Sequence, residues 1–143
     1  MADILEDFPI AVPPAKVFAA ITTPAGLDQW WTKTSAGRPV LGAEYELRFG
    51  PKFDWRARVS ACVVDEYFEL EMTRADEGWI GTRIGIRLAP KTGGTEVRFA
   101  HTGWPSVTEN FRVSTYCWAM YLRILKRYLE HGERVPYERR LSV

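Results

Sequence analysis

One histidine stands out among the residues that could do chemistry. His101 follows Val97 and Phe99 on the apolar side of an alternating segment, so its side chain is expected to point inward. An imidazole in that place could hydrogen-bond a ligand or act as a general base near neutral pH. It could equally be a neutral core histidine bonded to a backbone carbonyl or to Ser114. No inward carboxylate accompanies it, so the sequence predicts no acid–base pair and no catalytic residue is assigned.

The other reactive residue types lack the spacing that known chemistries require. The two histidines and the two cysteines, Cys62 and Cys117, are far apart, so we expect free thiols and no metal site. The chain has no nucleophile elbow, no phosphate-binding loop and no dinucleotide fingerprint. The sequence therefore predicts neither a metal nor another cofactor.

A long amphipathic helix is predicted over Ser106–Gly132. Ser106 and Glu109 fit a capping box at its start, and Gly132 stands where a left-handed residue would end it. One narrow arc of this helix carries an apolar stripe with one polar member, Thr115: Val107, Phe111, Thr115, Trp118, Leu122, Leu125 and Leu129. A helix of this length can cover a whole small sheet.

Alternating apolar and polar residues predict six strands before this helix. The expected inward sets begin with Ile4–Ile10 and continue with segments 45–49, 55–63, 68–72, 84–88 and 97–101. Two short helices, opening at Pro13-Pro14 and at Thr23-Pro24, separate the first strand from the other five. The links between the later strands are short, which permits only antiparallel neighbours. We therefore expect an α+β fold: a six-stranded antiparallel sheet with one long helix over it.

Composition and charge exclude some classes of function. With 143 residues and 46% apolar content, the chain is expected to form a single domain, residues 1–143, around one core. A net charge of +1 provides no field that would recruit nucleic acid. Charges interrupt the long helix on every turn, so no membrane span is expected. The first residues lack the features of a secretion signal, which makes a cytoplasmic location the expectation.

Four stretches spread over the chain carry a family resemblance. They are Pro14–Thr22, Leu27–Trp31, His101–Trp104 and the pattern Trp118, Leu122, Leu125, Lys126, Tyr128, Leu129, Glu130 and Gly132. Together with the element order, they resemble the helix-grip fold of the START-like (SRPBCC) superfamily, which includes birch-pollen allergens and polyketide cyclases. Within it the chain is similar to the branch of activators of the heat-shock-protein-90 ATPase. These motifs are structural, so they imply a fold more than a chemistry.

The resemblance implies a cavity between the curved sheet and the long helix that admits an apolar small molecule. The expected ligand contacts are Trp31, Tyr45, Phe49, Trp55, Met72, Ile86, Phe99 and His101, with Phe111, Thr115, Trp118 and Leu122 as the roof. Apolar walls with a few polar groups are typical of small-molecule pockets. Each inward aromatic side chain could instead be part of a filled core.

Three functions remain open at this point. The favoured hypothesis is a non-enzymatic binder or carrier of an apolar or aromatic small molecule. The second is a cyclase- or dehydratase-like enzyme that uses His101. The third is a chaperone-associated module, although 143 residues leave no room for the additional N-terminal domain of full-length activators. Either a monomer or a homodimer is compatible with the sequence.

Overall fold

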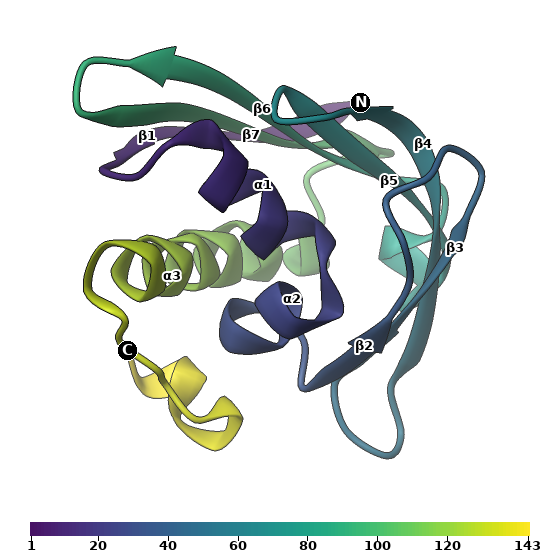
Figure 1. Cartoon of the computed structure of the whole chain (residues 1–143). Coiled ribbons are helices and arrows are strands. Elements are labelled where there is room, and N and C mark those ends of the chain that lie inside the picture. Colours follow the sequence, from purple (N-terminus) through teal and green to yellow (C-terminus); the bar gives the residue numbers. More distant parts are fainter.

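A strongly curved antiparallel sheet forms one layer of the molecule, and three α-helices lie against its concave face (Figure 1). The computed structural model describes residues 1–143. The strands run in the order β1-β7-β6-β5-β4-β3-β2. Their bounds are β1 Ala2–Ile10, β2 Thr34–Ala36, β3 Glu44–Arg48, β4 Asp54–Val63, β5 Tyr67–Arg74, β6 Arg83–Lys91 and β7 Gly94–Trp104.

The sheet has seven strands, so the predicted number of six is wrong. The additional strand is β2, which pairs with β3 through three residues, Thr34, Ser35 and Ala36. A segment this short and polar has no apolar alternation, because it is an edge strand with little to bury. The rest of the expected architecture, an α+β helix-grip fold, is confirmed.

A β-bulge in β4 changes which side chains face the core. The register with β5 shifts between Val59 and Ala61, so that Cys62 lies opposite the buried Phe68. A shift of one residue exchanges the two faces of a strand. Val63, expected to face inward, is therefore 49% exposed. Simple alternation predicts β4 correctly only up to this bulge.

Two short helices, α1 (Pro14–Thr22) and α2 (Pro24–Trp30), follow β1 directly. Thr23 separates them, and its side chain accepts a hydrogen bond from the Gly26 N–H to cap α2. Gly26 lies against the backbone of α1: a Cβ atom there would come within 2.5 Å of the Ala20 Cα. The tight turn directs the end of α2, and therefore Trp30 and Trp31, into the concave face.

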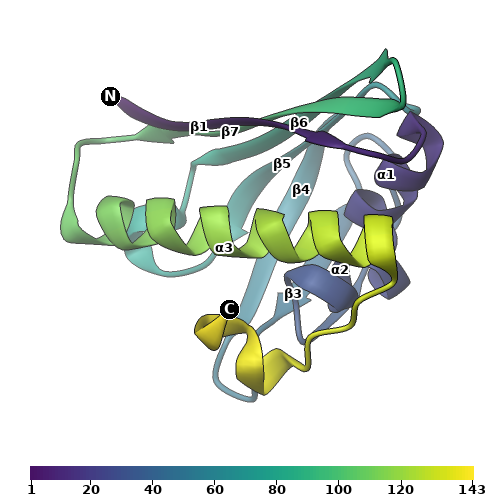
Figure 2. The same cartoon turned by 90° about the vertical axis from the view of Figure 1, so that its left-hand side faces the viewer.

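The long helix α3 (Glu109–His131) crosses the concave face (Figure 2). Its N-cap is Thr108, whose hydroxyl accepts the Phe111 N–H at 3.1 Å, and not Ser106 as the capping box suggested. Gly132 adopts the predicted left-handed conformation at the other end, with φ of 66°. None of the helices combines the length and apolar character that a membrane crossing requires.

The C-terminal segment turns back beside α3 and ends in a short 3-10 helix, η2 (Tyr137–Ser142) (Figure 2). Its anchor is Arg140, which is only 4% exposed. The guanidinium group donates to the backbone carbonyls of Asp28 at 2.6 Å and Thr32 at 3.0 Å. These bonds hold η2 against the end of α2, next to the aromatic side chains described below.

Candidate functional site

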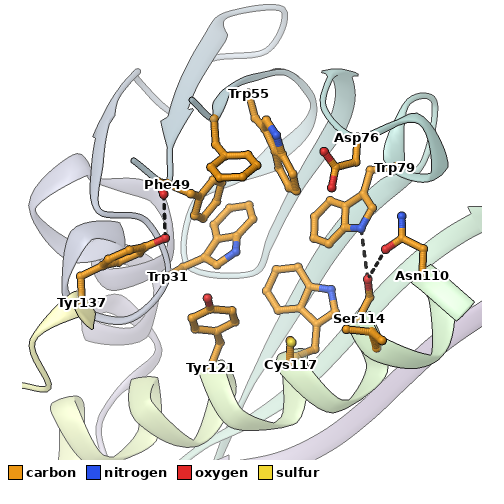
Figure 3. Close-up of a pocket in the computed structure, with 13 residues that line it drawn as sticks. Trp31, Phe49, Trp55, Asp76, Trp79, Asn110, Ser114, Cys117, Tyr121 and Tyr137 are labelled. Carbon is orange, nitrogen blue, oxygen red and sulfur yellow. Dashed lines mark hydrogen bonds between the residues drawn. The ribbon is translucent and has the colours of Figure 1, made fainter. Parts of the chain in front are cut away.

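A cavity of about 280 Å³ opens between α3, η2 and the half of the sheet that β3 and β4 form. Thirteen residues line it, and ten of them are hydrophobic. They are Trp31, Phe49, Phe53, Trp55, Asp76, Trp79, Asn110, Val113, Ser114, Cys117, Trp118, Tyr121 and Tyr137 (Figure 3). The exposed residues Phe53, Asp76 and Val113 mark its rim.

Five aromatic side chains form a closed circuit around this cavity. Phe49 contacts Trp55 with ring centroids 5.0 Å apart, and Trp55 contacts Trp79 at 4.9 Å. The circuit continues from Trp79 to Trp118 at 5.8 Å and from Trp118 to Trp31 at 5.2 Å. Trp31 closes it against Phe49 at 5.6 Å. The rings come from four separate parts of the chain, so the folded state assembles them.

A buried chain of hydrogen bonds through His101 holds the ring of Trp118 in place. The Trp118 N–H donates to His101 Nδ1 at 2.9 Å, and therefore the proton of the imidazole is on Nε2. Nε2 lies 2.7 Å from the Thr82 hydroxyl, to which it donates. That hydroxyl in turn donates to the carbonyl of Trp79. His101 thus links the ring of Trp118 to the backbone that carries Trp79.

His101 itself has no exposed surface and does not line the cavity. Burial lowers the pKa of this histidine to about 3, because the charged imidazolium would lose its hydration. Both ring nitrogens already have partners in the protein. His101 therefore matches the neutral core alternative, with Thr82 and Trp118 as partners in place of a backbone carbonyl or Ser114.

A second hydrogen-bond chain orients the wall at η1 (Glu77–Trp79). The Trp79 N–H donates to the Ser114 hydroxyl at 3.1 Å, and that hydroxyl donates to Asn110 Oδ1 at 3.2 Å. Ser114 is buried on α3, and Asn110 lies one turn before it. These bonds fix the tilt of the Trp79 indole relative to the helix (Figure 3).

Two donors point into the cavity without a hydrogen-bond partner in the protein. They are the Trp31 indole N–H and the Tyr121 hydroxyl, both on its inner side (Figure 3). Burial raises the pKa of Tyr121 to about 12, so the phenol keeps its proton at neutral pH. By contrast, the hydroxyl of Tyr137 donates to the carbonyl of Phe49 at 3.0 Å and thereby attaches η2 to the rim.

Four of the twelve sequence-predicted contact residues line this cavity: Trp31, Phe49, Trp55 and Trp118. Trp31 and its neighbour Trp30 have different roles. Trp30 is 1% exposed and donates its N–H to the Ala20 carbonyl at 3.0 Å, so it packs behind the cavity wall.

The other eight predicted residues lie elsewhere: Tyr45, Met72, Ile86, Phe99, His101, Phe111, Thr115 and Leu122. Most are buried in the filled core. Tyr45, for example, has no exposed surface and donates to the Thr22 carbonyl at 2.6 Å. Phe111 packs edge-on against Trp104, with centroids 5.4 Å apart. Thr115, expected in the roof, is exposed and donates to the Phe111 carbonyl of its own helix.

The roof was misplaced because α3 turns a second apolar row, which the narrow stripe omitted, toward the cavity. Val113, Cys117 and Tyr121 follow one another at the i, i+4 spacing, and they form the wall of the cavity on α3. Farther along, Met120 and Ile124 are also buried, because α3 packs against α2 and η2 as well as against the sheet. The i+4 row was visible in the sequence. Trp79, in a turn without periodicity, left no such signal.

A comparison with known protein families identifies the family of this chain. The family model described as "Activator of Hsp90 ATPase homolog 1-like protein" matches residues 11–130. The chain belongs to this family. The resemblance drawn from the four sequence stretches is thereby confirmed. The comparison with curated proteins finds no match.

Solved structures agree with the family in fold. The Aha1 dimer from Colwellia psychrerythraea is 29% identical to this chain in sequence. The match covers 93% of this chain and 99% of the Colwellia chain, with a TM-score of 0.85. The protein SSP2350 from Staphylococcus saprophyticus is 21% identical, with coverages of 94% and 96% and a TM-score of 0.79. CalU16 from Micromonospora echinospora is 20% identical, with coverages of 98% and 81% and a TM-score of 0.73.

Proposed function

We propose that this protein binds an apolar or aromatic small molecule in the cavity bounded by the aromatic circuit and releases it unchanged. The observation that carries the proposal is the closed circuit of five aromatic rings around an open space. Its volume of about 280 Å³ suits a compact aromatic ligand. The unpartnered donors of Trp31 and Tyr121 favour a ligand that also has an oxygen acceptor.

A carrier role is favoured over catalysis because the cavity contains no acid–base pair. The one carboxylate in the lining is Asp76, at the rim, and no histidine accompanies it. His101 could take a proton from a ligand only after losing one of its two hydrogen bonds. Recovery of the ligand in unaltered form, checked by mass spectrometry after prolonged incubation, supports the carrier; a changed mass supports an enzyme.

The binding test uses N-phenyl-1-naphthylamine, a neutral probe whose fluorescence rises in apolar surroundings. The full chain is expected to bind the probe saturably and to quench or shift tryptophan emission. Cys117→Phe places a ring inside the cavity and should abolish binding. Thr115→Phe adds the same ring to the exposed face of the same helix and should leave binding unchanged. Absence of saturable binding to the unmodified chain, or equal binding by both variants, rejects the proposal.

A second candidate, a chaperone cofactor, is favoured by the family match over residues 11–130. This role predicts that the chain binds heat-shock protein 90 and stimulates its ATPase. A titration of the chain into the chaperone, followed by phosphate release, tests it. If phosphate release does not change over the titration, this candidate is rejected. The small-molecule proposal is unaffected, because it is tested by a different measurement.

A further inference from the structure

We infer that the ligand of the cavity is an organic cation: an apolar body that carries an ammonium or aromatic cationic group held by the aromatic circuit and by Asp76. This inference rests on the proposed function, since it names the class of molecule that the same cavity takes. Two independent features support it, the number of tryptophan rings around the cavity and the charge of the lining.

The aromatic circuit around the cavity is rich in tryptophan. The face of an indole ring carries the negative side of its quadrupole, and tryptophan is the strongest of the aromatic side chains in attracting cations. Four of the five rings in the circuit are tryptophans, and they stand on different sides of one space (Figure 3). A cationic group placed there would contact more than one ring.

The lining of the cavity carries a negative charge, which would attract a cation. Among the thirteen lining residues, Asp76 is the only charged one, and none is lysine, arginine or histidine. The Asp76 carboxylate lies beside the rings of Trp55 and Trp79 (Figure 3). It makes no cap bond to η1, although it occupies the N-cap position. It also forms none of the salt bridges of the molecule, whereas Asp54, on the neighbouring strand, bonds Arg56 at 2.8 Å.

The same features disfavour an anionic ligand. A carboxylate or phosphate in the cavity would be repelled by Asp76 and would find no basic side chain among the lining residues. The Trp31 N–H and the Tyr121 hydroxyl can still donate to an ether or carbonyl oxygen on the inner side. The cation therefore belongs at the end of the ligand that faces Asp76.

The test compares three probes of similar size in competition with N-phenyl-1-naphthylamine. They are phenethyltrimethylammonium, its neutral carbon isostere (3,3-dimethylbutyl)benzene, and the anion 3-phenylpropionate. We expect the cation to bind roughly tenfold more tightly than the neutral isostere, and the anion to bind most weakly. Asp76→Asn should remove a several-fold part of this preference and leave the affinity for the neutral isostere unchanged. Glu77→Gln removes the same charge one residue away, outside the lining, and should change neither affinity.

The outcomes separate this inference from the proposed function. If the neutral isostere binds as tightly as the cation or more tightly, the inference of a cationic ligand is wrong, and the small-molecule proposal is unaffected. Failure of all three probes and of N-phenyl-1-naphthylamine to bind overturns both. An equal loss of preference in Asp76→Asn and Glu77→Gln overturns the role of Asp76, because the charge would then act only through the general field of the surface.

Discussion

The two halves of the concave face of this sheet differ in how densely their side chains pack. Beneath α1 and α2, aliphatic side chains such as Leu70, Ile84 and Ile86 pack around the rings of Trp30 and Phe68 and leave an internal space of only about 10 Å³. Between β3, β4 and the first half of α3, eight of the thirteen lining side chains are aromatic, and they leave about 280 Å³ open. Flexible aliphatic groups interdigitate, whereas large rigid rings meet at their edges and enclose space. We therefore interpret the first half as the core and the second as the binding site.

The largest expected difference between the halves is the cost of truncation. Leu70→Ala in the filled half should lower the free energy of unfolding by about 2–5 kcal/mol, because it leaves a cavity that its neighbours cannot close. Phe53→Ala at the rim of the open half, where the side chain is 46% exposed, should cost under about 1 kcal/mol but weaken probe binding. Urea denaturation measures both. Equal losses of stability would contradict the division into core and site.

A pH titration tests the buried hydrogen-bond chain through His101, which lies behind the open half. His101 has a folded-state pKa of about 3, below the value near 6.5 of an unfolded histidine, so only the unfolded state takes up this proton between those values. Its contribution to stability is therefore complete above about pH 6.5 and should fall by about 3 kcal/mol on acidification to pH 4.

The variants for this titration are His101→Gln, which should remove this part of the pH dependence, and His131→Gln as the matched control. His131 is exposed, so this variant controls for the replacement of a histidine outside the core. Unfolding midpoints across pH 4–8 give the comparison. A wild-type profile that superposes on that of His101→Gln would contradict a neutral, buried His101.

Adding volume should have opposite effects in the two halves. Ile84→Phe overfills the aliphatic half and should cost about 1–3 kcal/mol. Cys117→Phe enters the open half and should leave stability unchanged or raise it by about 1 kcal/mol, because it fills existing space. Thermal unfolding measures both variants. Comparable destabilisation by both would mean that the open half has no room for a ligand.

The smallest expected effect comes from removing a hydrogen bond that orients Trp79 in the cavity wall. Ser114→Ala leaves the Trp79 N–H without its acceptor and should lower stability by about 1 kcal/mol, with a loss of probe affinity. Ser106→Ala, before the start of α3, is the control and should change neither quantity, since the N-cap is Thr108. An unchanged affinity in Ser114→Ala would mean that the tilt of Trp79 does not matter for binding.

The same division explains how much could be predicted from the sequence. Regular periodicity predicted the antiparallel sheet, the long helix over it and the inward phase of His101, and the glycine at the helix end predicted the left-handed Gly132. It failed where periodicity is interrupted: at the bulge that turns Val63 outward and at the three-residue β2. In the site, Trp31, Phe49, Trp55 and Trp118 were predicted, and Trp79 was not. Trp79 lies in a turn, and only the tertiary fold brings it to the other rings.

The most direct test of the central claim is the set of indole N–H signals in a ¹H–¹⁵N correlation spectrum. On addition of N-phenyl-1-naphthylamine, the signals of Trp31, Trp55, Trp79 and Trp118 should shift. Those of Trp30 and Trp104 should move much less, because both are buried behind the cavity and do not line it. Shifts confined to the four wall tryptophans are the predicted result. Six unmoved signals, or larger shifts at Trp30 and Trp104 than at the four, would contradict a binding site within the aromatic circuit.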